Sequence, residues 1–184
     1  DISPEDTSAI GVCGQMHAPV PIDEHGNILY RSPPLWCDKR NVSQCEKLMR
    51  KISEDEYLPV TGNPITPAWM GIKVLWIKEN LPKVYEKTHK FLTPKDYLIF
   101  RLTGESSTDW SEASGSYLYD INRGDWSEEL AEVLEVDIDK FPQIHPSHKI
   151  VGEVTSEAAK ATGLSQGTPV VAGGGDFLCA LLGA

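Results

Sequence analysis

Strand-forming segments lie near both ends of this 184-residue sequence, and mainly helical signals lie between them. Near the start, AIGVCGQMH (9–17) is a short apolar run that ends in polar side chains, which predicts a buried strand with a polar exit. Near the end, Thr168–Ala172 is a second β-branched run. Strands so far apart in sequence are most simply neighbours in one sheet, with helices inserted between them. We therefore predict an α/β fold.

Residues 41–165 carry repeated signals for the starts and ends of helices. Asn41, Thr66 and Thr93 are capping side chains placed before a helical apolar period, and the last two precede a proline that suits the first helical position. Gly104 and Gly163 are placed to end two of these helices. We expect the first helix to be capped by Asn41 and to run through Lys51.

Residues 9–40 are predicted to form a strand and a hairpin. The segment 20–30 has two apolar arms around a turn that contains a Gly-Asn pair. In an extended LWCDKR segment, Trp36, Asp38 and Arg40 would lie on one side. A ring beside a carboxylate and a guanidinium suits a polyhydroxylated ligand, but a surface ion pair beside a core tryptophan would give the same pattern.

Charge and cysteine content exclude several classes of function. The sequence has 17 basic and 27 acidic residues, a net charge of −10, which disfavours binding to nucleic acid. The cysteines have the spacing of neither a zinc site nor a dense disulfide framework, so we expect buried, reduced thiols in a cytoplasmic protein and no metal site. No apolar run is long enough for a membrane span. The four cysteines are Cys13, Cys37, Cys45 and Cys179.

The segment VVAGGGDFLCALLGA (170–184) brings a strand into three glycines and one carboxylate, Asp176. No lysine follows the glycines, and Leu178 stands where the dinucleotide fingerprint requires its third glycine, so neither phosphate-binding motif is present. The glycines remove steric bulk, which lets a substrate or another backbone approach. Asp176 either faces a ligand, as is usual at strand ends of open α/β sheets, or only caps a helix.

The exit of the first strand carries a second candidate site. Gln15, Met16 and His17 can each form hydrogen bonds or pack against a ligand at this strand end. A single strand-end histidine is more often a structural residue than a ligand-binding one. These residues by themselves therefore leave both interpretations open.

Taken together, these segments resemble the FGGY family of carbohydrate kinases, and most closely its xylulokinase branch. IGVCGQMH, LWCDKR, GIKVLWIKEN, FLTPKDYLIFRLTGESSTDWSEASGSYLYD and TPVVAGGGD stand in the family's order, so the resemblance spans nearly the whole chain. It implies that residues 1–184 are part of an N-terminal domain with the ribonuclease-H-like fold of actin and hexokinase, incomplete here. Residues 9–40 would be its strand and hairpin region, 41–165 a mainly helical insertion, and 168–184 the strand, glycine turn and helix start.

The resemblance also implies roles for individual residues. Asp176 matches the family's general base on the sugar hydroxyl, the segment 108–114 matches a stretch that supports the cleft, and Gly174 and Gly175 would lie at the cofactor. The residues implied in sugar binding are Gln15, Met16, His17, Trp36, Asp38 and Arg40. Phe177 stands where xylulokinases commonly carry asparagine, which leaves the identity of the sugar open.

The implied activity is ATP-dependent phosphorylation of a sugar or polyol hydroxyl, with Mg²⁺ and with a xylulose-like ketose as the favoured substrate. Because Asp1 is not a start methionine, we expect the sequence to begin inside a longer one. An Asp-x-Gly-Thr motif before it and an ATP-binding domain after Ala184 would supply most ATP and Mg²⁺ contacts, so this piece alone is expected to be inactive. The alternative is a noncatalytic sugar-binding or regulatory module. A sheet edge left unpaired by missing strands suggests a homodimer.

Overall fold

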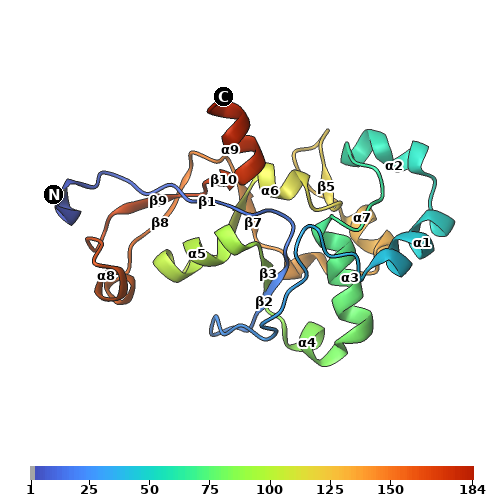
Figure 1. The fold of residues 1–184 in the computed structure, drawn as a ribbon, viewed down its shortest axis with the longest axis horizontal. Coiled ribbons are helices and arrows are strands. Elements are labelled where there is room, and N and C mark those ends of the chain that lie inside the picture. The colour runs from blue at the N-terminus through green and yellow to red at the C-terminus, as the bar shows by residue number, and fades with distance from the viewer. Residues whose placement is uncertain (1–2) are drawn as a thin grey trace.

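A computed structural model of the chain describes residues 3–184, in which short strands and helices alternate (Figure 1). The helices are α1 Val42–Lys51, α2 Glu54–Thr61, α3 Met70–Asn80, α4 Pro82–Lys87, α5 Pro94–Thr103, α6 Trp110–Ser114, α7 Glu128–Val133, α8 Ser156–Thr162 and α9 Asp176–Leu182, with 3₁₀ turns η1 Pro4–Asp6 and η2 Ile138–Lys140. The strands are β1 Cys13–Gly14, β2 Val20–Ile22, β3 Lys90–Leu92, β4 Ser107–Asp109, β5 Tyr119–Asp120, β6 Asp125–Trp126, β7 Gln143–His145, β8 Ile150–Glu153, β9 Pro169–Val171 and β10 Gly174–Gly175. The segment 41–165 thus holds six short strands besides its helices.

The two ends of the sequence meet, as predicted from the distant strand signals. β1 and β10 pair in parallel, with Cys13 opposite Gly174 and Gly14 opposite Gly175. The parallel pairing of these two segments begins before β1, where Ile10 forms a bridge with Val170 of β9. The remaining ladders are β2–β3, β5–β6 and β8–β9, all antiparallel, and β4–β7, which is parallel.

Two strand predictions are wrong in part. The segment 9–17 is not buried: Cys13 is exposed, Ile10 and Val12 are half-buried, and Met16 is its one buried side chain. The LWCDKR segment is not extended, because Asp38 closes a turn with its N–H donating to the carbonyl of Leu35 at 3.0 Å. The alternation that placed three side chains on one side is therefore absent.

The hairpin prediction for residues 20–30 is correct in outline. Ile22 bridges to Ile28 across the turn, and the Asp23 carboxylate accepts the N–H groups of His25 and Asn27 at 2.9 and 2.8 Å. This acceptor pattern is typical of an Asx turn. The longer partner of β2 is nevertheless β3, which the sequence did not predict.

Most helix boundaries agree with the capping residues, and one does not. Thr93 caps α5 by accepting the N–H of Asp96, and Gly104 ends that helix with a φ of 83°. In contrast, α3 begins at Met70 rather than at Thr66. The carbonyl of Pro67 accepts a hydrogen bond from the Asn41 side-chain amide at 3.0 Å, and the carbonyl of Ala68 accepts one from the Lys73 ammonium. These side chains take the place of helical N–H donors, so the helix starts later.

Helix α5 lies at the centre of the packing. Ile99 and Leu102 on one face join a core with α8 and β9, while Tyr97 and Phe100 pack against β2 and β3. A larger core, formed mainly by α1, α3, α4 and α7, fills the helical part to the right in Figure 1. Within residues 3–184, every helix is too short or too polar to cross a bilayer.

A left-handed glycine sets the turn between β9 and β10. Gly173 has a φ of 71°, and a Cβ on it would lie 2.0 Å from the Val12 carbonyl oxygen. Its N–H donates to the carbonyl of Ser147 at 2.9 Å, and the next N–H donates to the same Val12 oxygen at 3.1 Å. The turn can therefore approach β1 only with glycine at this position.

Replacing Gly173 with alanine should destabilise the chain strongly. Left-handed backbone costs a non-glycine residue roughly 1–2 kcal/mol, and displacing β1 to relieve the clash adds strain on the order of 1–3 kcal/mol. Gly163→Ala is the matched control, because Gly163 has a φ of 80° and open space around its Cβ position. Urea denaturation should give the larger loss for Gly173→Ala; equal losses would contradict the packing argument.

Candidate active site

Asp176 is an exposed carboxylate at the carboxyl end of β10. It is the first residue of α9, and the N-cap position belongs to Gly175. Its Oδ1 accepts the N–H of the next residue, Phe177, at 2.8 Å. The carboxylate is thus open to solvent and does not occupy the capping position that the sequence left as the alternative.

The exit of β1 lies beside this carboxylate. Gly14 is opposite Gly175 in the parallel ladder, so Gln15, Met16 and His17 leave β1 next to the start of α9. A Cβ on Gly175 would be 2.6 Å from the Met16 Cγ and Sδ atoms, so the Met16 side chain fills the space that the glycine leaves. The structure therefore brings the predicted residues of the two strand ends together.

His17 is held in one orientation. Its backbone has a φ of 70°, its Nδ1 lies 2.9 Å from the carbonyl oxygen of Gly115, and its ring packs edge-on against Trp69 at 5.1 Å. Because a carbonyl only accepts, Nδ1 carries the proton and Nε2 is left as an acceptor. Burial lowers the pKa of His17; the Gly115 hydrogen bond opposes this, and the charge of Asp176 also acts to raise it.

Asp38 and Arg40 form an ion pair, whereas the Trp36 side chain is largely exposed to solvent. The Arg40 Nη2 and Nε atoms lie 2.7 and 2.9 Å from Asp38 Oδ2, and Trp36 is 58% exposed. The guanidinium also donates to the Tyr30 hydroxyl at 3.2 Å. A hydrogen bond from Arg40 is the main reason that the pKa of Asp38 is lowered.

The charge of Lys73 acts on both His17 and Asp38. Lys73 was not among the predicted site residues. It is fully buried in α3 and its ammonium donates to the carbonyl of Ala68. Burial lowers the pKa of Lys73 to about 8, and the charge of Asp38 acts in the opposite direction. Its charge also lowers the pKa of His17, so Lys73 lies within electrostatic reach of both groups.

A buried cluster of charges lies beneath the site and was also missed. Lys95 Nζ is 2.7 Å from Asp96 Oδ1 and 3.0 Å from Asp109 Oδ1, and all three side chains are at most 1% exposed. The same ammonium donates to the carbonyl of Ala172 at 2.7 Å. The sequence does carry a signal for this cluster. In FLTPKDY and SSTDWSEAS, charged residues stand beside capping hydroxyls within segments whose apolar pattern indicates burial.

Ser111 connects this cluster to the strand that precedes Asp176. The Gly175 N–H donates to Ser111 Oγ at 2.8 Å, and that hydroxyl donates to Asp109 Oδ2 at 2.6 Å. Ser147 Oγ donates to the same oxygen at 2.8 Å. Lys95 and Ser111 therefore hold the chain on both sides of the glycine turn, at Ala172 and at Gly175.

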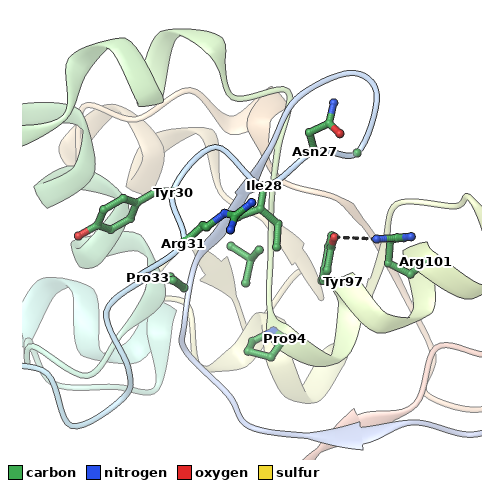
Figure 2. A pocket seen from close by; sticks show the side chains of 10 residues that line it. Asn27, Ile28, Tyr30, Arg31, Pro33, Pro94, Tyr97 and Arg101 are labelled. Carbon is green, nitrogen blue, oxygen red and sulfur yellow. Dashed lines mark hydrogen bonds between the residues drawn. The ribbon is translucent and has the colours of Figure 1, made fainter.

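A large hollow lies elsewhere on the described part of the chain. Its volume is about 640 Å³, and it opens between the hairpin loop and α5. Figure 2 shows Tyr97 and Arg101 of α5 on one side of it, joined by a hydrogen bond of 3.3 Å, with Tyr30 and Arg31 across from them. None of the predicted site residues lines this hollow.

Comparison with known proteins decides the family. The sequence profile described as "FGGY family of carbohydrate kinases, N-terminal domain" matches residues 1–183. The chain belongs to the FGGY family of carbohydrate kinases. The xylulose kinase of Bacillus subtilis (strain 168) is 36% identical over 184 residues, which cover 100% of this chain and 36% of that relative.

Solved structures of FGGY kinases have the same fold. The crystal structure of xylulose kinase from Rhodospirillum rubrum superposes with a TM-score of 0.90 at 30% identity and covers 95% of this chain and 36% of its own. Plasmodium falciparum glycerol kinase with ADP gives 0.88 at 25% identity, covering 96% and 35%. The predicted α/β fold of the actin and hexokinase type is confirmed. The FGGY chain spans about a third of the length of these proteins.

The two glycines expected at the cofactor do not offer free donors. The Gly174 N–H is bound to the Val12 carbonyl, and the Gly175 N–H is bound to Ser111. A Cβ at either position would meet a sulfur atom, of Cys179 or of Met16, within 2.8 Å. The glycine turn therefore does not fit a phosphate cradle. In the part of the chain that the structure describes, no three acidic, histidine or cysteine side chains are grouped to hold a metal.

Glu112 adds a neutral acid to the buried cluster of this FGGY chain. It is 3% exposed, and neither carboxyl oxygen has a hydrogen-bond partner among residues 3–184. Burial raises the pKa of Glu112 to about 9, and the negative charge of Asp96 acts in the same direction. Its side chain is therefore protonated at neutral pH, which leaves fewer negative charges around Lys95.

Ser111→Ala should weaken the anchor of the glycine turn. The variant leaves the buried Gly175 N–H without its acceptor, at a cost of roughly 1–3 kcal/mol of unfolding free energy. Amide hydrogen exchange at Gly175 should become faster. Ser114→Ala is the control on the same helix, since Ser114 Oγ donates only to the Ser111 carbonyl at 2.8 Å. Unchanged protection of Gly175 in Ser111→Ala would contradict the anchoring role.

Glu112→Gln should flatten the pH dependence of stability. The folded chain keeps the Glu112 proton to about pH 9, while the unfolded chain loses it near the ordinary value of 4.5. Between these values unfolding releases a proton, so rising pH favours the unfolded state by about 1.4 kcal/mol per pH unit. Urea midpoints at pH 5 and pH 8 should therefore converge in the variant, and Glu105→Gln, at an exposed position, should leave the wild-type difference in place.

Proposed function

We propose that the full-length protein containing this chain transfers a phosphoryl group from ATP to a hydroxyl of a sugar or polyol, with a xylulose-like ketose as the favoured substrate. The observation that carries the proposal is the exposed Asp176 carboxylate, placed beside the β1 exit and anchored from beneath by Ser111 and Lys95. The xylulose kinases among its relatives support the choice of substrate.

The proposed role of Asp176 is that of general base. Phosphoryl transfer passes through a loose transition state that needs alignment and charge stabilisation more than a strong base. A single carboxylate that orients the acceptor hydroxyl and takes its proton as the new P–O bond forms is sufficient. The proton moves from the sugar oxygen to an Asp176 carboxyl oxygen, and the nucleoside diphosphate leaves.

His17 and its neighbours would hold the sugar. The free acceptor on Nε2 suits a sugar O–H, and Met16 supplies an apolar contact for C–H groups. The remaining binding residues that we propose are Gln15, Trp36, Asp38 and Arg40. Phe177, 69% exposed next to Asp176, would place a ring at the rim and so influence which sugars fit.

Mg²⁺ would accompany ATP in the proposed reaction and neutralise phosphate charge. Residues 3–184 contain no group of three acidic, histidine or cysteine side chains that could hold it. The homodimer suggested by the unpaired edge stays a prediction. A noncatalytic sugar-binding or regulatory module is the second candidate, and it shares the binding residues. Only turnover separates the two.

Asp176→Asn in the full-length protein should abolish measurable phosphorylation. Loss of a general base lowers kcat by roughly a hundredfold or more, while an amide of the same shape leaves sugar binding detectable by calorimetry. Asp139→Asn is the matched control, because Asp139 is an exposed carboxylate outside the site. Retained turnover in Asp176→Asn would refute the base assignment; absence of turnover in the wild type with intact sugar binding would favour the noncatalytic module.

A further inference from the structure

Two of the four cysteines lie on facing elements at the edge that carries Asp176. Cys13 is exposed on β1, and Cys179 is half-buried on α9. The expectation that all four thiols are buried is wrong, because Cys45 is the one buried cysteine. The chain therefore offers two accessible sulfur atoms on neighbouring segments that are far apart in sequence.

Gly174 shows that the two thiols point into the same space. Cys13 and Gly174 are direct partners in the parallel ladder, so their Cβ directions lie on one face of the ladder. A Cβ on Gly174 would stand 2.8 Å from the Cys179 Sγ atom. Cys179 Sγ therefore lies over the neighbour of Cys13, on the face to which the Cys13 side chain points. No side chain at Gly174 separates them.

The titration of Cys179 agrees with this geometry. Burial raises the pKa of the Cys179 thiol, and a hydrogen bond from the Cys179 S–H to the Cys13 side chain raises it further. A thiol with a raised pKa is a poor attacking group, because the thiolate is the nucleophile. Cys13 is the more exposed of the two, so it is the first to meet an oxidant from solution.

We propose that Cys13 and Cys179 form a reversible disulfide that joins β1 to α9. The oxidant is a low-molecular-weight disulfide such as oxidised glutathione. The Cys13 thiolate attacks one sulfur of the oxidant, breaks its S–S bond and releases one reduced thiol. Cys179 then loses its proton and attacks the Cys13 sulfur of the mixed disulfide, which releases the second reduced thiol. Two protein thiols are oxidised and one disulfide molecule is reduced to two thiols, so the exchange balances.

The disulfide would fix the segment that carries the proposed base. Cys179 lies one helical turn after Asp176 on α9, and Cys13 lies two residues before Gln15. A covalent link between them would hold the start of α9 against β1 and restrict any movement of the two strand ends around a substrate. This effect on activity rests on the proposed kinase function, whereas formation of the disulfide does not.

The test treats the full-length protein with oxidised glutathione and maps its cysteines by mass spectrometry after alkylation. We expect a cross-linked peptide that joins Cys13 to Cys179 and that disappears with dithiothreitol. Cys179→Ser should trap glutathione on Cys13, while Cys13→Ser should leave Cys179 unmodified. Cys37→Ser is the control, because Cys37 is a second exposed cysteine that the proposed disulfide does not use, and it should leave the cross-link unchanged.

Three results would overturn the proposal: glutathione retained on Cys13 of the wild type without a cross-link, a disulfide between two copies of the chain, or pairing of Cys13 with Cys37. If the cross-link forms, sugar phosphorylation should fall at least severalfold and recover with dithiothreitol, and Cys13→Ser, which carries neither the cross-link nor a glutathione adduct, should escape the loss. Unchanged turnover in the cross-linked protein would refute the effect on activity. A cross-link in a protein that phosphorylates no sugar in either redox state would refute the proposed function and leave the redox site standing.

Discussion

The ammonium group of Lys95 is the interaction on which the arrangement of this chain depends most. It contacts carboxylates from the start of α5 and the end of β4, and it donates to the backbone just before the glycine turn. Helix α5, strand β4 and the backbone at Ala172 therefore share one buried cation. Removing a partner from such a cluster is expensive, on the order of 3–5 kcal/mol, because an uncompensated charge stays buried. The segments are therefore expected to hold their relative positions closely.

This cluster explains how an exposed carboxylate can be positioned without contacts of its own. Among residues 3–184, Asp176 makes one side-chain hydrogen bond, which it accepts from the N–H of its neighbour Phe177. Its position comes instead from the backbone before it, where Ser111 binds the Gly175 N–H and Lys95 binds the Ala172 carbonyl. Because Oδ1 bonds only to the Phe177 N–H, the second carboxyl oxygen, Oδ2, has no hydrogen-bond partner among residues 3–184 and is available to a substrate. Rigidity is thus supplied by the buried charges, and reactivity by the exposed one.

The three glycines serve the same end, each against a different neighbour. Gly173 lets the turn approach the Val12 carbonyl, Gly174 leaves room for Cys179, and Gly175 leaves room for Met16. The space that the sequence pattern assigned to a substrate or a second backbone is used by the chain itself. Close packing of β1, β10 and α9 is therefore the direct consequence of the glycine run, and access for a sugar follows from the exposure of Asp176.

The sequence alone predicted the elements with local signals and missed the features that depend on distant contacts. Thr93 and Gly104 mark α5 through bonds within a few residues, and the pairing of the two end strands follows from their apolar runs. The late start of α3 could not be predicted from local signals, because the side chains of Asn41 and Lys73 bind the carbonyls that would otherwise accept helical N–H groups. Likewise Lys95, Asp109 and Glu112 read as ordinary polar residues until the fold buries them. The strength of the Lys95–Asp109 ion pair and the raised pKa of Glu112 both depend on the exclusion of water, which is a property of the packed chain.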